Sequence, residues 1–265
     1  MTLRGVVLDL DGTVYHGDNV LPGVDGLVAA VRARDCSLCF FSNNPIHDSD
    51  DYVQRLQGLG VDARPGEACS SGVVTSEYLH TEHAGEDVFV IGSDAVRDQV
   101  RETAAELTDE PAAADVLLAS WTDGFHYRNL VDALRAVDDD TAFLGTDPDR
   151  TFPDENGDPV PGSGAIIRAV AGVLDRDPDH VLGKPSDVAV AATLERLDCA
   201  AEECLIVGDR LDTDIRMGER SGMTTVLVTT GVSSRADIEH SDIRPDHVVD
   251  SLDAVTPIVE DLTAD

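Results

Sequence analysis

The chain has very few lysines and very few aromatic residues. Of its 19 basic residues 18 are arginine, the only lysine is Lys184, and aromatic residues make up 4% of the 265 positions. Acidic residues number 52, which gives a formal net charge of -33. A surface this acidic argues against nucleic acid and anionic membranes as partners. Because the acidic residues occur throughout the chain, the composition resembles that of proteins from salt-accumulating halophiles, in which concentrated salt screens the repulsion.

The sequence also lacks long apolar runs and paired cysteines. No run of 18 apolar residues is present, and the first residues lead directly into a strand-like segment, so we expect neither a membrane span nor a signal peptide, and a cytoplasmic location. The five cysteines are scattered and odd in number, which argues against a disulfide framework. Cys36 and Cys39 have CxxC spacing, but no second pair completes a zinc site, so we expect buried free thiols.

Short apolar runs alternate with segments of helical periodicity. This alternation predicts an α/β fold with a doubly wound, Rossmann-like parallel sheet. Residues 85–178 contain their own strand and helix series and are predicted to form an inserted α/β domain, with the core domain in residues 1–84 and 179–265. The core strands are expected at residues 5–10, 37–42, 179–183, 204–209, 224–230 and 246–250. Within the insert, a helix is expected over 94–107 and a long binding loop over 146–164.

Polar residues follow four of the expected core strands. Because ligands of open α/β sheets bind outside the carboxyl ends of the strands, we expect these side chains to converge. Carboxylates, one lysine and one serine suit Mg²⁺ and a phosphate, since Mg²⁺ prefers oxygen ligands and a lysine supplies a compact positive charge. The residues are Asp9, Asp11 and Thr13 in "DLDGT", Ser42 and Asn43, Lys184 in "GKP", and Asp209, Asp212 and Asp214 in "GDRLDTD".

The ordered motifs DxDGT, Ser, GKP and GDxxxTD resemble those of the haloacid dehalogenase-like (HAD) superfamily. The position of the insert resembles subfamily IIA, the phosphatases related to NagD and p-nitrophenylphosphatase. The resemblance covers nearly the whole chain, since "TDPDRTFPDENGDPVPGSGA" is similar to that group's TNPD…P…G…PGxGA segment. It implies a Rossmann-like core with an inserted cap domain of the C2 type. Together with the acidic composition, it predicts that the protein comes from a halophilic archaeon.

The resemblance implies a Mg²⁺-dependent phosphomonoester hydrolase acting on a sugar phosphate, glycerol phosphate, phosphoglycolate or nucleoside monophosphate. Asp9 would be the nucleophile that forms an aspartyl phosphate. Asp11 would protonate the leaving alcohol and then activate the hydrolytic water, which requires a raised pKa. Phosphoryl oxygens would be bound by Ser42, the Asn43 backbone amide and Lys184, with Thr13 orienting the loop. Mg²⁺ would be bound by Asp9, the backbone carbonyl of Asp11, Asp209 and Asp214, the last through metal waters.

Two other functions use similar residues. A phosphotransferase would pass the aspartyl phosphate to another alcohol, and a non-enzymatic phosphate sensor like a receiver domain would also use Asp, Thr and Lys. Asp11 and the large insert argue against the receiver. The sequence does not determine the oligomeric state, and a homodimer is one of the states it allows.

Several residues have two interpretations. Asp212 is better explained as solvated surface, and Ser42 has an alternative role as a cap of the following turn. Arg150 and Arg210 would either contact an anionic substrate or pair with surface acids. The cap departs from the family pattern at Asp147, where Asn is expected, and at Thr122, where Asp is expected, which affects substrate preference. The residues that would contact the leaving group, or else belong to the cap core, are Trp121, Phe125, His126 and Tyr127.

Overall fold

The computed structural model describes residues 2–154 and 158–264, and the chain folds into two compact units. Unit 1 comprises Met1–Ser42, Ser49–Cys69 and Ala189–Asp265, and unit 2 comprises Asn43–Asp48 and Ser70–Val188. The boundaries of these units differ from those of the expected domains, residues 1–84 with 179–265 and residues 85–178. The expected domain boundaries stay a prediction. Over the described ranges, no helix is long and apolar enough to cross a membrane.

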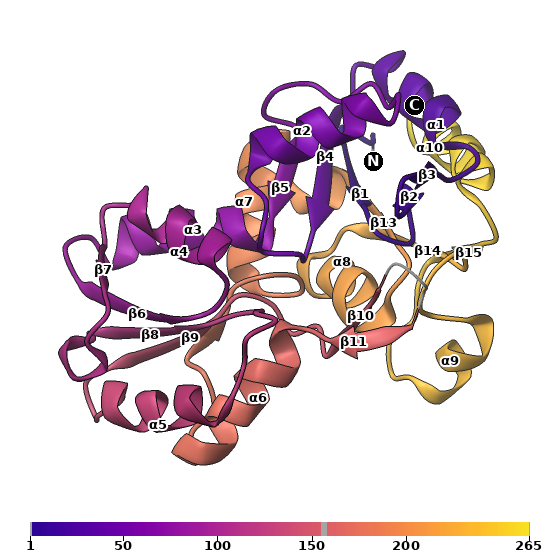
Figure 1. Ribbon diagram of the computed structural model, residues 1–265. Helices are drawn as coiled ribbons and strands as arrows, with labels where there is room; N and C mark the ends of the chain where they lie inside the picture. The colour runs from indigo at the N-terminus through magenta and orange to yellow at the C-terminus, as the bar shows by residue number, and fades with distance from the viewer. Residues whose placement is uncertain (1, 155–157, 265) are drawn as a thin grey trace. The chain divides into compact units, whose positions relative to one another are not determined.

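A six-stranded sheet forms the centre of unit 1, in the order β15-β14-β13-β1-β4-β5 (Figure 1). The neighbours from β15 to β4 pair in parallel. All five residues of β1 and of β13 are buried, as expected for strands that are covered on both faces. The strands are β1 (Gly5–Asp9), β4 (Ser37–Ser42), β5 (Ala68–Ser70), β13 (Cys204–Gly208), β14 (Thr224–Val228) and β15 (His247–Val249).

The helices of unit 1 bury apolar faces against this core. In α1, Val24, Leu27, Val28 and Val31 have the spacing of one helix face and are all buried. A hairpin of β2 (Tyr15–His16) and β3 (Asn19–Val20) lies between β1 and α1 in the sequence. The helices are α1 (Val24–Arg32), α2 (Ser49–Gly58), α7 (Asp187–Leu197, which begins in unit 2), α8 (Arg216–Ser221), α9 (Arg235–His240) and α10 (Thr256–Leu262).

Unit 2 contains a parallel five-stranded sheet in the order β12-β9-β8-β6-β7. Figure 1 shows α3 and α4 on one side of this sheet and α5 and α6 on the other. A separate antiparallel hairpin pairs β10 (Thr151–Pro153) with β11 (Pro159–Pro161). The remaining elements are β6 (Asp87–Ile91), β7 (Glu106–Thr108), β8 (Val116–Ala119), β9 (Ala142–Gly145), β12 (His180–Val181), α3 (Ser71–Glu82), α4 (Asp94–Arg101), α5 (Tyr127–Ala136) and α6 (Ser163–Leu174).

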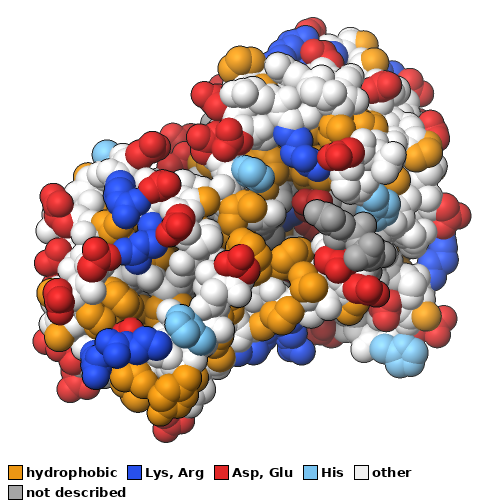
Figure 2. Space-filling view, in the orientation of Figure 1, with side chains coloured by type: hydrophobic (Ala, Val, Ile, Leu, Met, Phe, Trp, Pro, Cys, Tyr) orange, Lys and Arg blue, Asp and Glu red, His pale blue; other side chains and the backbone are white. Residues whose placement is uncertain are grey.

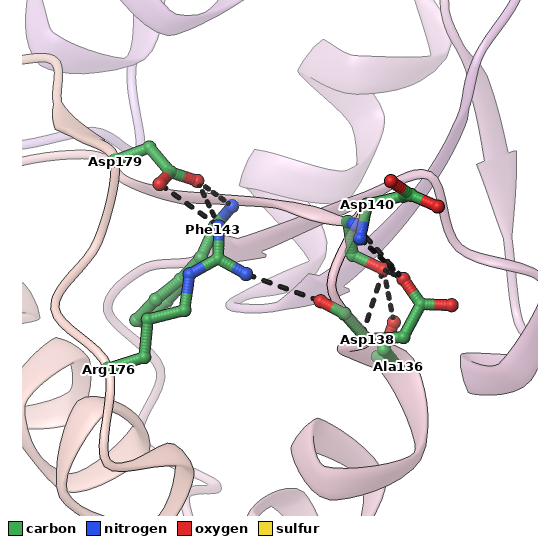
Figure 3. A network of polar contacts seen from close by, with 7 residues as sticks. Ala136, Asp138, Asp140, Phe143, Arg176 and Asp179 are labelled. Atoms are coloured by element: carbon green, nitrogen blue, oxygen red, sulfur yellow. Dashed lines mark hydrogen bonds and ion pairs between the residues drawn. The ribbon is translucent and has the colours of Figure 1, made fainter.

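The expected core strand over residues 179–183 was assigned to the wrong sheet. The structure places β12 beside β9 in unit 2. Polar contacts hold this edge in place (Figure 3): the backbone N–H of Phe143 donates to the Asp179 carboxylate at 2.7 Å, and Arg176 also donates to that carboxylate. The Arg176 guanidinium further reaches the backbone oxygen of Asp138. These contacts therefore fix the segment before Lys184 to the second sheet.

Two segments of the insert, residues 94–107 and 146–164, differ from the elements expected from the sequence. The helix expected over 94–107 ends at Arg101, because the Thr103 hydroxyl donates to the Val100 carbonyl and accepts from Ala105 N–H, and β7 follows. The expected loop over 146–164 contains the β10–β11 hairpin, and its residues 155–157 lie outside the described residues.

The acidic excess is distributed over the surface. Figure 2 shows Asp and Glu side chains scattered over the visible face. Arginines on exposed positions pair with them, as Arg216 does with Asp242 and Arg235 with Asp250. Such exposed pairs contribute little stability each, so the acidic excess mainly affects solubility and long-range electrostatics.

Candidate active site

Three carboxylates come together at the carboxyl end of the unit 1 sheet. Asp9 is the last residue of β1, Asp209 directly follows β13, and Asp214 lies in the helical turn Leu211–Ile215. One carboxylate oxygen from each lies within 4.8 Å of the others, and all three residues are buried. Adjacent parallel strands bring Asp9 and Asp209 together, as the sequence pattern predicts.

Glycines make room for this carboxylate cluster. A Cβ on Gly231 would lie 2.0 Å from an Asp209 carboxylate oxygen, and one on Gly208 would lie 2.3 Å from the Asp214 carboxyl carbon. Gly12 has a φ of 92°, a conformation that other residues adopt only with strain, and its Cβ would lie 2.6 Å from Asp209. Gly231 cannot be recognised from the sequence, because it is a lone glycine in the turn after β14.

Backbone donors further fix the acidic side chains. The N–H of Val232 donates to Asp209 Oδ2 at 2.6 Å, and the N–H of Arg210 donates to Asp214 Oδ2 at 3.2 Å. The Ser233 N–H donates to the backbone oxygen of Asp209. The cluster is thus preorganised by the chain around it.

The residues of this cluster fit a hard divalent cation. Three buried carboxylates so close together repel one another strongly in a low-dielectric interior, and a bound cation removes that repulsion. Their oxygen donors suit Mg²⁺, which binds carboxylates and keeps several waters. An acidic cluster of this kind therefore fits the metal expected from the sequence.

Asp11 and Thr13 occupy the tight turn after β1. The N–H groups of Val14 and Tyr15 both donate to the Leu10 carbonyl, and Gly12 N–H donates to the Tyr15 carbonyl. Asp11 is exposed, whereas Thr13 is fully buried, and the Thr13 hydroxyl has no hydrogen-bond partner among the described residues. Burial raises the pKa of Tyr15 above its usual range, and the negative charge of Asp11 adds to that effect. The Asp11 carboxylate therefore lies in the neighbourhood of Tyr15, at the accessible side of the turn.

Ser42 is the buried last residue of β4. Its side chain hydrogen-bonds with Tyr52 from α2, a fully buried tyrosine whose pKa is raised well above its usual value by burial. Tyr52 was missed in the sequence because nothing in "SDDYVQ" distinguishes it from an ordinary core residue. It anchors the Ser42 side chain from within unit 1.

Asn43 and Lys184 lie together in unit 2. Lys184 is 1% exposed and Asn43 7% exposed. The Asn43 carboxamide oxygen accepts from Lys184 N–H at 2.9 Å, and its nitrogen donates to the Lys184 carbonyl at 3.1 Å. The same nitrogen lies 3.4 Å from an Asp149 carboxylate oxygen. The family resemblance implies a phosphate-binding role for the Asn43 backbone amide only. It predicts no role for the Asn43 side chain.

Asp147 is a buried carboxyl at the end of β9. Its oxygens contact the Thr146 hydroxyl at 3.0 Å and the Asp149 N–H at 3.2 Å, and Thr146 continues to the Ser120 hydroxyl at 3.0 Å. Burial, reinforced by the charge of Asp149, raises the pKa of Asp147 to about 8. A protonated Asp147 has the shape and the neutral charge of the asparagine expected from the family pattern.

The remaining candidates differ in exposure. Asp212 is exposed, as expected for solvated surface, and Arg150 is exposed as well. Phe125 packs against the apolar core of unit 2, Trp121 meets Phe152 edge to face, and Tyr127 is 80% exposed. His126 is exposed at the start of α5, where its N–H donates to the Asn129 side chain. Thr122 and Arg210 are both half-buried.

Comparisons with known proteins agree with these motifs. A family model described as haloacid dehalogenase-like hydrolase matches residues 6–106, and one described as HAD-hydrolase-like matches residues 181–255. The sugar-phosphatase AraL of Bacillus subtilis is 30% identical, covering 97% of this chain and 93% of the relative. An acid sugar phosphatase of Staphylococcus aureus is 27% identical, covering 91% and 92%.

Solved structures give the same result. A p-nitrophenyl phosphatase from Archaeoglobus fulgidus superposes with a TM-score of 0.89 at 29% identity, covering 97% of this chain and all of that one. NagD from Escherichia coli gives a TM-score of 0.85 at 27% identity, covering 96% and 98%. The chain therefore belongs to the haloacid dehalogenase-like hydrolases, in the branch that includes NagD and the p-nitrophenyl phosphatases.

Proposed function

We propose that the protein is a Mg²⁺-dependent phosphatase that hydrolyses small phosphomonoesters through an aspartyl phosphate on Asp9. The observation that carries this proposal is the buried Asp9, Asp209 and Asp214 cluster at the carboxyl ends of adjacent parallel strands. The names of its relatives, a sugar phosphatase and a p-nitrophenyl phosphatase, support the same reaction class and favour a sugar phosphate as substrate.

Asp9 is suited to nucleophilic attack because it is the buried last residue of β1, a strand that pairs with β4 on one side and β13 on the other. Its carboxylate oxygen forms a bond to phosphorus while the bond from phosphorus to the leaving alcohol breaks, which divides the hydrolysis into two easier steps. Asp11, exposed in the following turn, gives a proton to the leaving oxygen. In the second step Asp11 takes a proton from the attacking water, and inorganic phosphate leaves Asp9.

The remaining assignments concern charge and orientation. Asp9, Asp209, Asp214 and the Asp11 carbonyl would hold the Mg²⁺, which when bound neutralises negative charge on the phosphoryl group. Ser42, the Asn43 amide and Lys184 are proposed to bind phosphoryl oxygens, and Thr13 to orient the turn. We further propose a cytoplasmic location.

The test is phosphate release from a panel of sugar phosphates and other small phosphomonoesters in concentrated KCl, with Mg²⁺ or with EDTA. The variant is Asp9→Asn, and the matched control is Asp212→Asn, which removes one exposed charge from the helical turn that also carries Asp214. We expect Mg²⁺-dependent release by the wild type and the control, and none by Asp9→Asn.

Other outcomes would assign a different function. Release that survives in Asp9→Asn would remove the nucleophile role. Transfer of labelled phosphate to an added alcohol, with little release to water, would indicate a phosphotransferase. A stable phosphoenzyme without turnover would indicate a phosphate sensor.

A further inference from the structure

We propose that the side chain of Asn43 is a positioning residue that clamps the backbone of Lys184 and so fixes the chain's only ammonium side chain. This role is separate from the phosphate contact assigned to the Asn43 backbone amide. Its catalytic consequence depends on the proposed function, whereas the clamp itself does not.

The clamp is a pair of hydrogen bonds to one residue. The carboxamide of Asn43 accepts from the N–H of Lys184 at 2.9 Å and donates to the carbonyl of the same residue at 3.1 Å. Both peptide groups that flank the Lys184 Cα are therefore held by one planar group. This geometry restricts the backbone from which the lysine side chain extends.

The clamp is itself anchored on its other sides. The Ser71 hydroxyl, fully buried at the start of α3, donates to the Asn43 backbone oxygen at 2.6 Å. The carboxamide nitrogen also faces an Asp149 carboxylate oxygen at 3.4 Å. Since this nitrogen faces two acceptors, the orientation of the amide is fixed by its partners.

The residue before Lys184 also fits this arrangement. A Cβ on Gly183 would lie 2.8 Å from the Asn43 carboxamide oxygen and 2.9 Å from the Thr146 carbonyl. Gly183 N–H donates to that carbonyl at 2.6 Å. The glycine of the "GKP" motif therefore allows the Asn43 side chain and the end of β9 to approach the lysine turn closely.

Two substitutions separate the clamp from the backbone amide. Asn43→Ala removes the carboxamide and keeps the backbone N–H. Asn43→Asp keeps the size but places carboxylate oxygens against the Lys184 carbonyl and Asp149, which repels both. The matched control is Asn129→Asp, because Asn129 accepts from His126 N–H, a role that a carboxylate retains.

The readout uses the absence of other lysines. An amine-reactive N-hydroxysuccinimide ester can modify only Lys184 and the chain's α-amino group, and mass spectrometry of the arginine-bounded fragment of residues 177–196 reports Lys184 alone. Because Lys184 is 1% exposed, we expect slow labelling in the wild type and in Asn129→Asp. We expect at least tenfold faster labelling in Asn43→Ala and Asn43→Asp.

Folded Asn43 variants that label at the wild-type rate would overturn the clamp. Unfolding of both variants, followed by far-UV circular dichroism, would overturn it too, because Asn43 would then be needed for the fold as a whole. The labelling result does not require catalysis, so it stands even if the wild type hydrolyses nothing.

A kinetic cycle tests the route through Lys184. If Asn43 acts through Lys184, the single variant Asn43→Asp should have a kcat/KM at least tenfold below that of the wild type. The double variant Asn43→Asp, Lys184→Ala should have the same kcat/KM as the single variant Lys184→Ala. If instead the double variant loses kcat/KM by the product of the two single losses, Asn43 acts on another group, and the proposal is contradicted.

Discussion

The buried carboxyl of Asp147 should make a contribution to the stability of the protein that falls as the pH rises. Asp147 is 2% exposed, and its pKa is raised to about 8 by burial and by the nearby charge of Asp149. In the unfolded chain the same group titrates near its ordinary pKa of 3.8. Between these values the native state holds a proton that the unfolded state has released. The stability that Asp147 contributes is therefore present below about pH 4 and is lost as the pH rises through about 8.

Asp147→Asn should remove this dependence. Each pH unit in this range changes the free energy of unfolding by about 1.4 kcal/mol. From about pH 5.5 to about pH 8, the free energy of unfolding of the variant should therefore rise by about 3 kcal/mol relative to that of the wild type. An asparagine can accept from Asp149 N–H and donate to the Thr146 hydroxyl. That hydroxyl then donates to Ser120, so the hydrogen bonds survive with the donor direction reversed.

Urea unfolding in concentrated KCl measures this difference. Trp121 is the only tryptophan and belongs to the same unit as Asp147, so its fluorescence reports unfolding there. The control Asp158→Asn changes an exposed carboxylate, and we expect it to change stability little. The reasoning fails if wild type and Asp147→Asn show parallel pH dependences, or if the variant is the less stable protein at pH 8.

Three further predictions concern the carboxylate cluster and its turn. Asp214→Asn should weaken Mg²⁺ binding in calorimetry at least tenfold, and Asp212→Asn should not, so equal affinities would exclude Asp214 from the metal site. Gly231→Ala should weaken Mg²⁺ binding as well, because its Cβ would lie 2.0 Å from an Asp209 oxygen, and unchanged affinity would show that the loop moves freely. Asp11→Asn should reduce kcat at least a hundredfold while sparing Mg²⁺ affinity, and normal turnover would remove Asp11 from acid-base catalysis.

Much of the fold follows from patterns that are local in sequence. Each buried strand of unit 1 is a short apolar run, and the polar residues that end β1 and β13 are close together because neighbouring parallel strands end at the same edge. The end of α4 was mispredicted since "RETAAELT" has no Gly or Pro. Thr103 ends the helix there through contacts that no propensity rule reports.

The sheet to which a two-residue strand belongs is set by distant partners. The run "DHVLG" resembles "DHVVD", the run that contains β15 of unit 1, so its sequence fits either sheet. The contacts of Asp179 with Phe143 in β9 and with Arg176, which follows α6, place the run in the sheet of unit 2. A sequence pattern does not contain this information because all three residues are ordinary surface or core types.

The role of Asn43 illustrates the same limit within the site itself. Its position after β4 identified the residue, and the family pattern then assigned only the backbone amide. The partner of its side chain is 141 positions away. That partner is the only lysine in a chain of 265 residues, so no other ammonium side chain can replace it if the turn loosens. A carboxamide that holds both backbone groups of that residue therefore limits where the chain's one ammonium side chain can lie.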